Sequence, residues 1–372
     1  MLKGLLHKLS NLPGWHTNRK IIVFESDDWG SIRMPSKYHY QQLTNKGLDL
    51  SVGDSARYNK YDTLASKEDL TDLFDLLIEF KDKNGNYPVF TAVSVVANPD
   101  FEKIRLSNFQ EYFYEPFTTT LDRYNLNESF NIWQLGIKEK LFYPQFHARE
   151  HLNVASWMRA LQKNDKMTHL AFDHGFWGFR NKKSSPVNYQ AAFDLENPSD
   201  LILQKEILTD GLKLFEKIHG YKARFFVPPN GPVNIELIRL ATQLAISCIS
   251  TAKIQMEPIG NNKFRTRFHY LGQKITSGSI YLTRNAFFEP SDHAKDWIDA
   301  CMYDISQAFK FKKPVVISTH RVNYIGTHST QNRDNGLNAL KLLLYRMLRE
   351  WPEIEFMTSN MLGETIMRKN NA

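Results

Sequence analysis

The sequence predicts a mostly parallel α/β fold. Short apolar runs typical of buried strands alternate along nearly the whole chain with longer segments whose apolar residues recur at helical spacing. The chain has 372 residues, of which 42% are hydrophobic, and this is enough for a substantial core. Length alone is compatible with two domains or with one large barrel. Because no repeat and no clear linker divides the chain, we expect a single domain over residues 1–372.

The elements predicted for the first third of the chain begin with a short buried strand at 21–24. A helix follows at 67–80, where apolar residues recur at helical spacing, and the apolar run at 88–96 predicts the next strand. The aromatic stretch within 98–127 fits neither a helical nor a strand period. We therefore expect an irregular insertion there, lying over the core.

Strands and helices alternate regularly in the rest of the chain. The predicted strands cover 141–146, 223–227, 245–250, 279–283, 314–319 and 354–357. The predicted helices cover 154–161, 200–218, 291–309 and 335–350. Each helix can therefore cross over between two parallel strands.

Charge and hydropathy exclude several classes of protein. The formal net charge is +7, but the basic residues occur singly, which is typical of a solvated surface and not of specific nucleic-acid binding. The basic N-terminal segment lacks the apolar core of a secretory signal, because Lys3, His7 and Lys8 interrupt it. No run approaches the roughly 18 apolar residues of a membrane span. We expect a cytoplasmic protein without a membrane span, and the sequence does not indicate its oligomeric state.

The two cysteines point to structural roles. Cys248 and Cys301 each lie inside an apolar run, and no Cys-x-x-Cys spacing is present. This pattern indicates neither a disulfide framework nor a thiolate metal site. We expect two buried free thiols.

An acidic cluster follows the first predicted strand. The run at 21–24 continues directly into Glu25-Ser26-Asp27-Asp28-Trp29-Gly30. Neighbouring residues of an extended strand point to opposite faces, so Asp27 and Asp28 can serve one site only if the strand ends or bulges there, as Gly30 would permit. A helix cap in a solvated loop is the alternative interpretation.

A pair of histidines follows the strand at 141–146. His147 and His151 are four residues apart, and either a helix or a turn at the strand end can bring them together as metal ligands. In a chain with twelve histidines the spacing can also arise by chance. Combined with the acidic strand end, the pair could form an Asp-His-His site with open positions, which is typical of a catalytic metal.

Two further strand ends carry residues of interest. The strand at 223–227 ends in Pro228-Pro229-Asn230-Gly231, a rigid turn that can hold a substrate or merely terminate the strand. The run at 315–319 is followed by His320, which alone would more often be structural. The carboxyl ends of parallel strands meet at one edge of a sheet or barrel, so all four groups are expected to lie together.

In this order, the motifs resemble those of the polysaccharide deacetylase, or NodB-homology, family. The sequence ESDDW at 25–29 is similar to the family's Thr-Phe-Asp-Asp-Gly, and His147 and His151 match its two metal histidines. VPPNG at 227–231 is similar to Arg-Pro-Pro-Tyr-Gly, and His320 matches the histidine of its Leu-x-His motif. The resemblance implies a distorted (β/α)7 barrel with inserted loops over about residues 18–365.

The resemblance also implies a mechanism and its residues. Asp28, His147 and His151 would hold a divalent metal, most readily Zn²⁺, although Co²⁺, Ni²⁺ or Mn²⁺ also fit such ligands. Asp27 would be the catalytic base and His320 the proton donor to the departing amine. The substrate would be an N-acetylated amino sugar or glycoconjugate, with O-deacetylation left open.

Substrate contacts and one positioning residue are less well specified. We expect Trp29, Pro229, Asn230 and His174 to contact the substrate; His174 lies in an aromatic and glycine-containing stretch at 172–178 whose aromatics are better explained by core packing. Val227 stands where the family has an arginine that holds the catalytic aspartate. Either Arg224 substitutes for that arginine or the base works differently.

Two other functions remain open at this stage. His147, Glu150 and His151 also satisfy the His-x-x-Glu-His pattern of zinc metallopeptidases, with Glu150 as the base, but Pro144 opposes the long helix that such a site needs. A non-catalytic carbohydrate-binding protein on the same fold is the other alternative.

Overall fold

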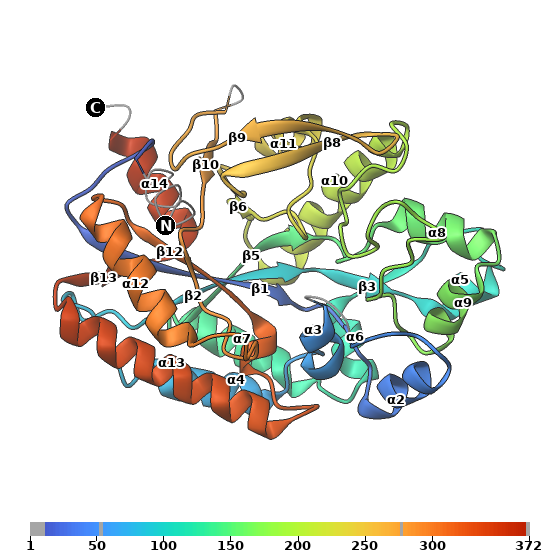
Figure 1. The fold of residues 1–372 in the computed structure, drawn as a ribbon, viewed down its shortest axis with the longest axis horizontal. Coiled ribbons are helices and arrows are strands. Elements are labelled where there is room, and N and C mark those ends of the chain that lie inside the picture. The colour runs from blue at the N-terminus through green and yellow to red at the C-terminus, as the bar shows by residue number, and fades with distance from the viewer. Residues whose placement is uncertain (1–11, 52–54, 276–277, 370–372) are drawn as a thin grey trace.

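The computed structural model describes residues 12–51, 55–275 and 278–369, and its centre is a curled parallel sheet (Figure 1). In spatial order the strands are β10 (Ile280–Leu282), β7 (Cys248–Ser250), β6 (Phe225–Phe226), β5 (Phe142–Ala148), β2 (Phe90–Val95), β1 (Lys20–Trp29), β12 (Val315–His320) and β11 (Ala286–Phe287). A further strand, β13 (Ile354–Phe356), pairs with the start of β1. Every strand expected from the sequence has a counterpart, and the predicted α/β barrel-type fold is confirmed.

Helices cover the outer face of this sheet and connect its strands. They include α4 (Lys67–Leu77), α7 (Glu128–Lys138), α8 (Val154–Gln162), α10 (Asp200–His219), α11 (Ile235–Gln243), α12 (Trp297–Lys310) and α13 (Thr330–Glu350). In Figure 1, α4, α12 and α13 lie along one side of the sheet and α10 and α11 along the opposite side. The four longer helices expected from the sequence are all present, although α12 begins at Trp297 and not near 291, with Asp296 as its N-cap.

The expectation of an irregular insertion at 98–127 is wrong. This segment contains the antiparallel pair β3 (Ala97–Pro99) and β4 (Tyr114–Pro116) and the helices α5 (Phe101–Leu106) and α6 (Phe117–Arg123). These elements have three to seven residues, too few to show a hydrophobic period in the sequence.

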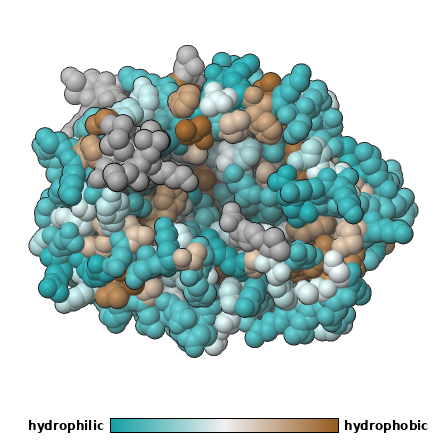
Figure 2. Space-filling view, viewed as in Figure 1, coloured by the Kyte–Doolittle hydropathy of each residue, from teal (hydrophilic) through white to brown (hydrophobic). Residues whose placement is uncertain are grey.

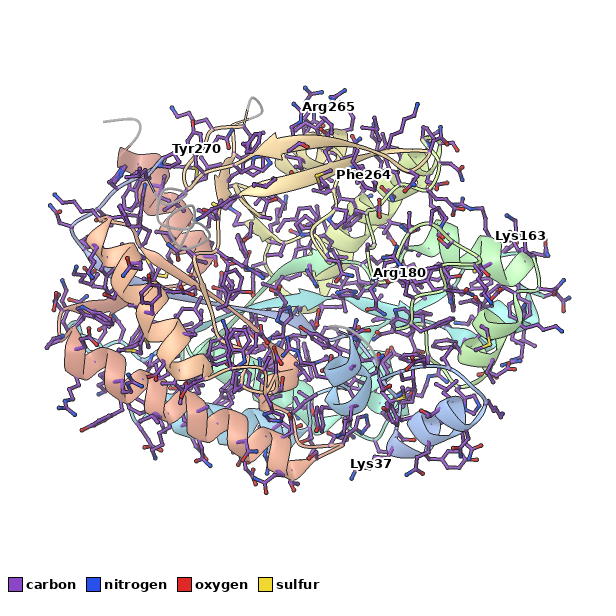
Figure 3. All side chains as sticks on the ribbon, viewed as in Figure 1. Lys37, Lys163, Arg180, Phe264, Arg265 and Tyr270 are labelled. Atoms are coloured by element: carbon purple, nitrogen blue, oxygen red, sulfur yellow. The ribbon has the colours of Figure 1, made fainter. Side chains whose placement is uncertain are left out.

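The sequence also gave no indication of several other elements. They include α7, α11 and β11 above, α2 (Lys37–Asn45), α3 (Ala56–Tyr61), α9 (Lys166–Asp173), the short 3₁₀ helix after β12 (Arg321–Tyr324), the antiparallel hairpin of β8 (Ile254–Gly260) and β9 (Lys263–Phe268), and the C-terminal helix α14 (Ser359–Lys369). The exposed face of this hairpin carries Phe264, with Tyr270 just beyond it (Figure 3). Tyr58 of α3 lines the pocket described below, and β8 of the hairpin directly follows Lys253, which also lines it.

Alternate residues of β1 face two separate apolar clusters. Ile22 and Phe24 pack in the larger cluster between the sheet and the outer helices. Ile21 and Val23 pack in a smaller cluster inside the curled sheet, with Leu362 of helix α14 (Ser359–Lys369). Since strand side chains alternate with a period of two, the interior of the sheet is apolar at this end of β1.

The surface hydropathy and the state of the two cysteines are as the sequence predicted. The face in Figure 2 is mostly hydrophilic, with small separate groups of hydrophobic residues, and the basic residues Lys37 and Lys163 lie at different edges of the view in Figure 3. Cys248 and Cys301 are buried free thiols, as expected. Within the described ranges, no helix has the length and apolar character to cross a membrane. Residues 1–11 of the N-terminal segment lie outside the described residues.

Candidate metal and catalytic site

A pocket of about 540 Å³ opens at the carboxyl ends of the parallel strands. Its walls come from the ends of β1, β5 and β12 and from the segments that follow β6, β7 and β10. The residues lining it include Asp27, Asp28, His147, His151 and His320. The strand ends singled out in the sequence therefore meet at one pocket, as expected for a parallel sheet.

A bulge in β1 brings two consecutive aspartates to this pocket. The alternation that turns Ile21 and Val23 inward also turns Asp27 inward. Asp28 would then face outward, but the register against β2 shifts between Ser26 and Trp29, and Asp28 adopts a left-handed backbone with φ of 76°. Asp is one of the residue types that tolerate the left-handed region, and strained backbone positions cluster at functional sites.

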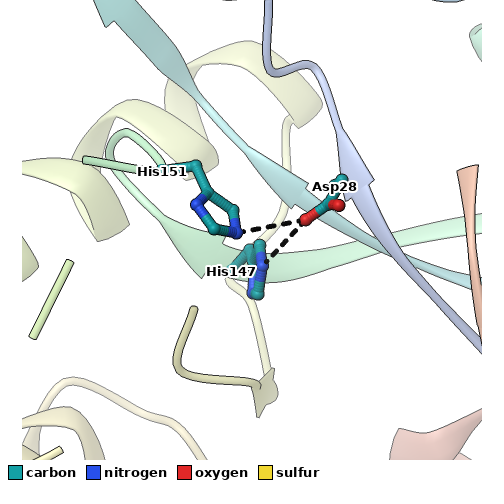
Figure 4. A group of neighbouring side chains, drawn as sticks. All are labelled: Asp28, His147 and His151. Carbon is teal, nitrogen blue, oxygen red and sulfur yellow. Dashed lines mark ion pairs between the residues drawn. The ribbon is translucent and has the colours of Figure 1, made fainter. Parts of the chain in front are cut away.

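Asp28, His147 and His151 converge on one point (Figure 4). Asp28 Oδ1 lies 3.2 Å from His151 Nε2 and 3.5 Å from His147 Nε2. All three side chains are buried, and one ligand atom from each lies within 4.8 Å of the others. Tetrahedral Zn²⁺ with bonds of ~2.0–2.1 Å separates its ligands by ~3.4 Å, so the two measured distances fit such an ion.

The protonation states also suit a metal. His147 Nδ1 lies 2.6 Å from the carbonyl oxygen of Val227. A carbonyl only accepts, so Nδ1 donates, which leaves Nε2 on the side of Asp28 as the ring atom available to a metal. Burial lowers the pKa of His151 to about 4. Burial would raise the pKa of Asp28, but His151, His147 and Arg33 together hold it well below its usual value.

Arg284 holds Asp27 in place. Its Nη2 donates to Asp27 Oδ1 at 2.6 Å and its Nη1 to Oδ2 at 2.7 Å, while Nε donates to buried Glu25 at 2.7 Å. Such a two-point contact fixes both position and orientation of a carboxylate. Arg224, which the sequence offered for this role, instead contacts the Ala245 carbonyl oxygen and lies exposed outside the pocket. Arg284 directly follows a predicted strand end, a signal that the sequence carried and that was missed.

Glu289 holds His320. Its Oε1 lies 2.5 Å from His320 Nδ1, which leaves Nε2 facing the pocket at 3.9 Å from Asp27 Oδ2. Burial would lower the pKa of His320, but the Glu289 carboxylate outweighs burial and raises it. Arg57 and Asn323 also donate to Glu289, at 2.7 and 2.9 Å. No motif in the sequence pointed to Glu289.

The four expected substrate contacts have different outcomes. Asn230 lines the pocket, but Pro229 does not, because it is buried, and Pro228 lines the pocket beside it. Trp29 does not fit the expectation, because it is 1% exposed and packs edge-on against Phe142 in the core.

His174 does not fit its expected role either. It lies beside His39 and Lys46 and away from the pocket lining. Its aromatic neighbours Phe172, Phe176 and Trp177 are buried core residues, as the packing interpretation predicted.

The metallopeptidase pattern is not supported by the backbone. His147 lies in strand β5 and His151 in the bends that follow it, so no helix carries the pair. Glu150 is buried and accepts from Arg149 Nε and Nη2 at 2.7 and 2.9 Å. Its carboxylate is committed to this ion pair and is not positioned as a base.

The sequence matches no family model and no curated protein. The fold is similar to a structure described as a polysaccharide deacetylase from Mycobacterium smegmatis (10% identity, TM-score 0.44, 96% of this chain and 94% of that one). It is also similar to one so described from Pseudomonas aeruginosa PAO1 (8%, 0.46, 94% and 91%). A third, described as a glycoside hydrolase/deacetylase, is from Parabacteroides distasonis (9%, 0.47, 96% and 73%). Identities and TM-scores this low do not assign a function, which has to come from the geometry of the site.

Proposed function

We propose that the protein is a metal-dependent deacetylase that hydrolyses the acetamide of an N-acetylated amino sugar or glycoconjugate. The observation that carries the proposal is the meeting, at one pocket, of an Asp-His-His group with a clamped carboxylate and a carboxylate-paired histidine. A pocket of about 540 Å³ is within the size range of small-molecule sites.

Asp28, His147 and His151 would hold the metal, and their donor atoms fit a divalent ion such as Zn²⁺. Bound there, the ion would supply Lewis-acid polarisation of the acetyl carbonyl and of the attacking water. The pKa of Asp28 is held well below its usual value and that of His151 is lowered to about 4, so both side chains already favour the deprotonated forms that bind a metal.

Asp27 and His320 would divide the proton transfers. Asp27, with both oxygens oriented by Arg284, would accept a proton from the attacking water. His320, kept protonated by Glu289, would donate a proton to the departing amine nitrogen through Nε2. The amide bond breaks, the acetyl group leaves as acetate, and the sugar leaves as an amine.

The test is metal-dependent acetate release from N-acetylglucosamine oligomers and nucleotide sugars. We expect His151→Ala to lose bound metal and activity together. Asp27→Asn and His320→Ala should retain metal and lose turnover by about 10²- to 10⁴-fold. Activity that persists with a chelator would contradict the mechanism. No acetate from any substrate with metal-loaded wild type would favour the carbohydrate-binding alternative.

A further inference from the structure

Arg33 occupies a fixed position beside the candidate metal site. It lies in the loop between β1 and α2, where the Ile32 amide donates to Asn98 Oδ1 at 2.9 Å and the Met34 amide donates to the Asp62 carbonyl oxygen at 3.1 Å. The backbone on both sides of Arg33 is therefore held in place. Its side chain is 6% exposed and lines the pocket with Asp28 and His151.

The guanidinium of Arg33 has few partners for a buried cation. Its Nε lies 3.8 Å from Asp62 Oδ2, beyond hydrogen-bond range, and its Cζ lies 5.0 Å from the centre of the Tyr58 ring. Among the described residues, Nε and Nη1 have no hydrogen-bond partner. Asp62 Oδ1 accepts from Arg321 Nε at 3.0 Å, while Asp62 Oδ2 has no hydrogen-bond partner among the described residues and forms only the long ion pair with Arg33. Buried donors without acceptors are costly, and a ligand with anionic oxygens would satisfy them.

The charge around the pocket favours an anionic ligand once the site is loaded. The charged side chains that surround it are the carboxylates Glu25, Asp27, Asp28, Asp62 and Glu289 and the cations Arg33, Arg57, Lys253, Arg284 and Arg321. These five negative and five positive charges balance. A divalent cation and a protonated His320 would then leave an excess of three positive charges. Electrostatic complementarity then favours a substrate that carries negative charge.

We propose that Arg33 is a specificity-determining residue that binds a carboxylate or phosphate group on the substrate, close to the acetamide. The inference rests on the proposed function and narrows its substrate to an acidic acetylated sugar. A guanidinium is suited to this role because its planar fork can donate two parallel hydrogen bonds to either group. The fixed backbone on both sides of Arg33 reduces the ordering that such binding requires.

The test is calorimetric binding of sugars that differ by one acidic group to the Zn²⁺-loaded protein, with Asp27→Asn present throughout so that turnover is suppressed; wild type and variants below refer to the other positions. N-acetylmuramic acid and N-acetylglucosamine 1-phosphate are the carboxylate and phosphate probes, and N-acetylglucosamine is the neutral reference. We expect wild type to bind at least one acidic probe about tenfold or more tightly than the reference. Arg33→Gln should lose this preference, whereas Arg33→Lys should keep part of it, since it keeps the charge without the fork. Lys253→Gln, which removes another pocket-lining cation, should retain the preference.

Equal binding of acidic and neutral sugars by wild type would overturn the proposal. The proposal would also be overturned if folded Arg33→Gln kept the preference for acidic sugars and changed only its metal affinity. Arg33 would then only balance the charge of Asp28. If Lys253→Gln loses the preference and Arg33→Gln retains it, the anion site lies elsewhere. Acidic sugar binding without acetate release would contradict the deacetylase function and leave the anion site standing. Acetate release without a preference for acidic sugars would support the deacetylase function and contradict the anion site.

Discussion

The two ends of the interior of the curled sheet have opposite character. At the end where β1 begins, Ile21 and Val23 pack with Leu362 and Ile366 of helix α14 in a closed apolar cluster. At the end where β1 stops, the same alternation presents charged side chains to an open pocket. Strand β1 therefore contributes residues to both ends. Its apolar residues stabilise the fold by burial, and its acidic residues form part of the candidate catalytic site.

The charged end is stable only if its charges are paired. Burial raises the pKa of Glu25, and Arg284 counteracts this by contacting both Glu25 and Asp27. The residues of the apolar cluster are hydrophobic side chains, which need no such pairing. The comparison predicts that mutations at the charged end affect function and stability together, whereas mutations at the apolar end affect stability alone.

The largest effect is expected from Arg284→Met. This change leaves Glu25 and Asp27 buried without their cation, so we expect the free energy of unfolding at neutral pH to fall by about 3–5 kcal/mol and acetate release to be lost. Urea unfolding and the acetate assay measure the two effects. Arg224→Met, at an exposed arginine, is the control and should change neither. Unaltered stability of Arg284→Met would show that the charged end does not depend on this pairing.

Leu362→Ala should show the other half of the comparison. Leu362 is fully buried in the apolar end, so its truncation leaves a cavity and should cost about 2–5 kcal/mol of stability. Metal affinity, measured by calorimetry on the folded variant, should stay at the wild-type value. Met361→Ala, on the same helix at a residue that is 49% exposed, is the matched control and should cost much less. A weakened metal site in Leu362→Ala would mean that the two ends are coupled.

The short apolar runs made the strands of the sheet predictable. Their alternation with helices indicated parallel strands, and because parallel strands end at the same edge, the meeting of the four strand ends was predictable too. Trp29 was misassigned because the bulge at Asp28 shifts the alternation: Asp27 and Asp28 both face the pocket, and Trp29 turns outward into the core. The sequence showed that a bulge was needed but not which residues it would reorient.

The position of Arg284 after a predicted strand end did not show which side chain it would contact, and no motif pointed to Glu289. They lie on either side of β11, a strand of two residues, and they meet Asp27 and His320 across more than 250 and about 30 positions of the chain respectively. Their roles depend on tertiary contacts, which carry no local periodicity. Arg33 is a similar case, since its position depends on Asn98 in the segment expected to be irregular.

The smallest effect is expected from Glu289→Gln, which keeps the shape of the charged end and removes one charge. Glu289 raises the pKa of His320, so wild type keeps its proton donor charged to higher pH, and kcat/KM falls as pH rises through that pKa. Without the carboxylate the pKa of His320 falls, and the alkaline limb of the profile moves to lower pH.

The stability that the His320–Glu289 pair contributes also decreases as pH rises. It is fully present below the unfolded histidine pKa of about 6.5 and is lost as pH rises through the folded value. The activity loss at alkaline pH should stay below the roughly 10²- to 10⁴-fold expected for removing the donor itself. Glu353→Gln removes the same charge from an exposed position and is the control. An alkaline limb that does not move in Glu289→Gln would show that His320 is not the proton donor or that Glu289 does not tune it, and normal metal binding by the variant would exclude a disrupted site as the cause.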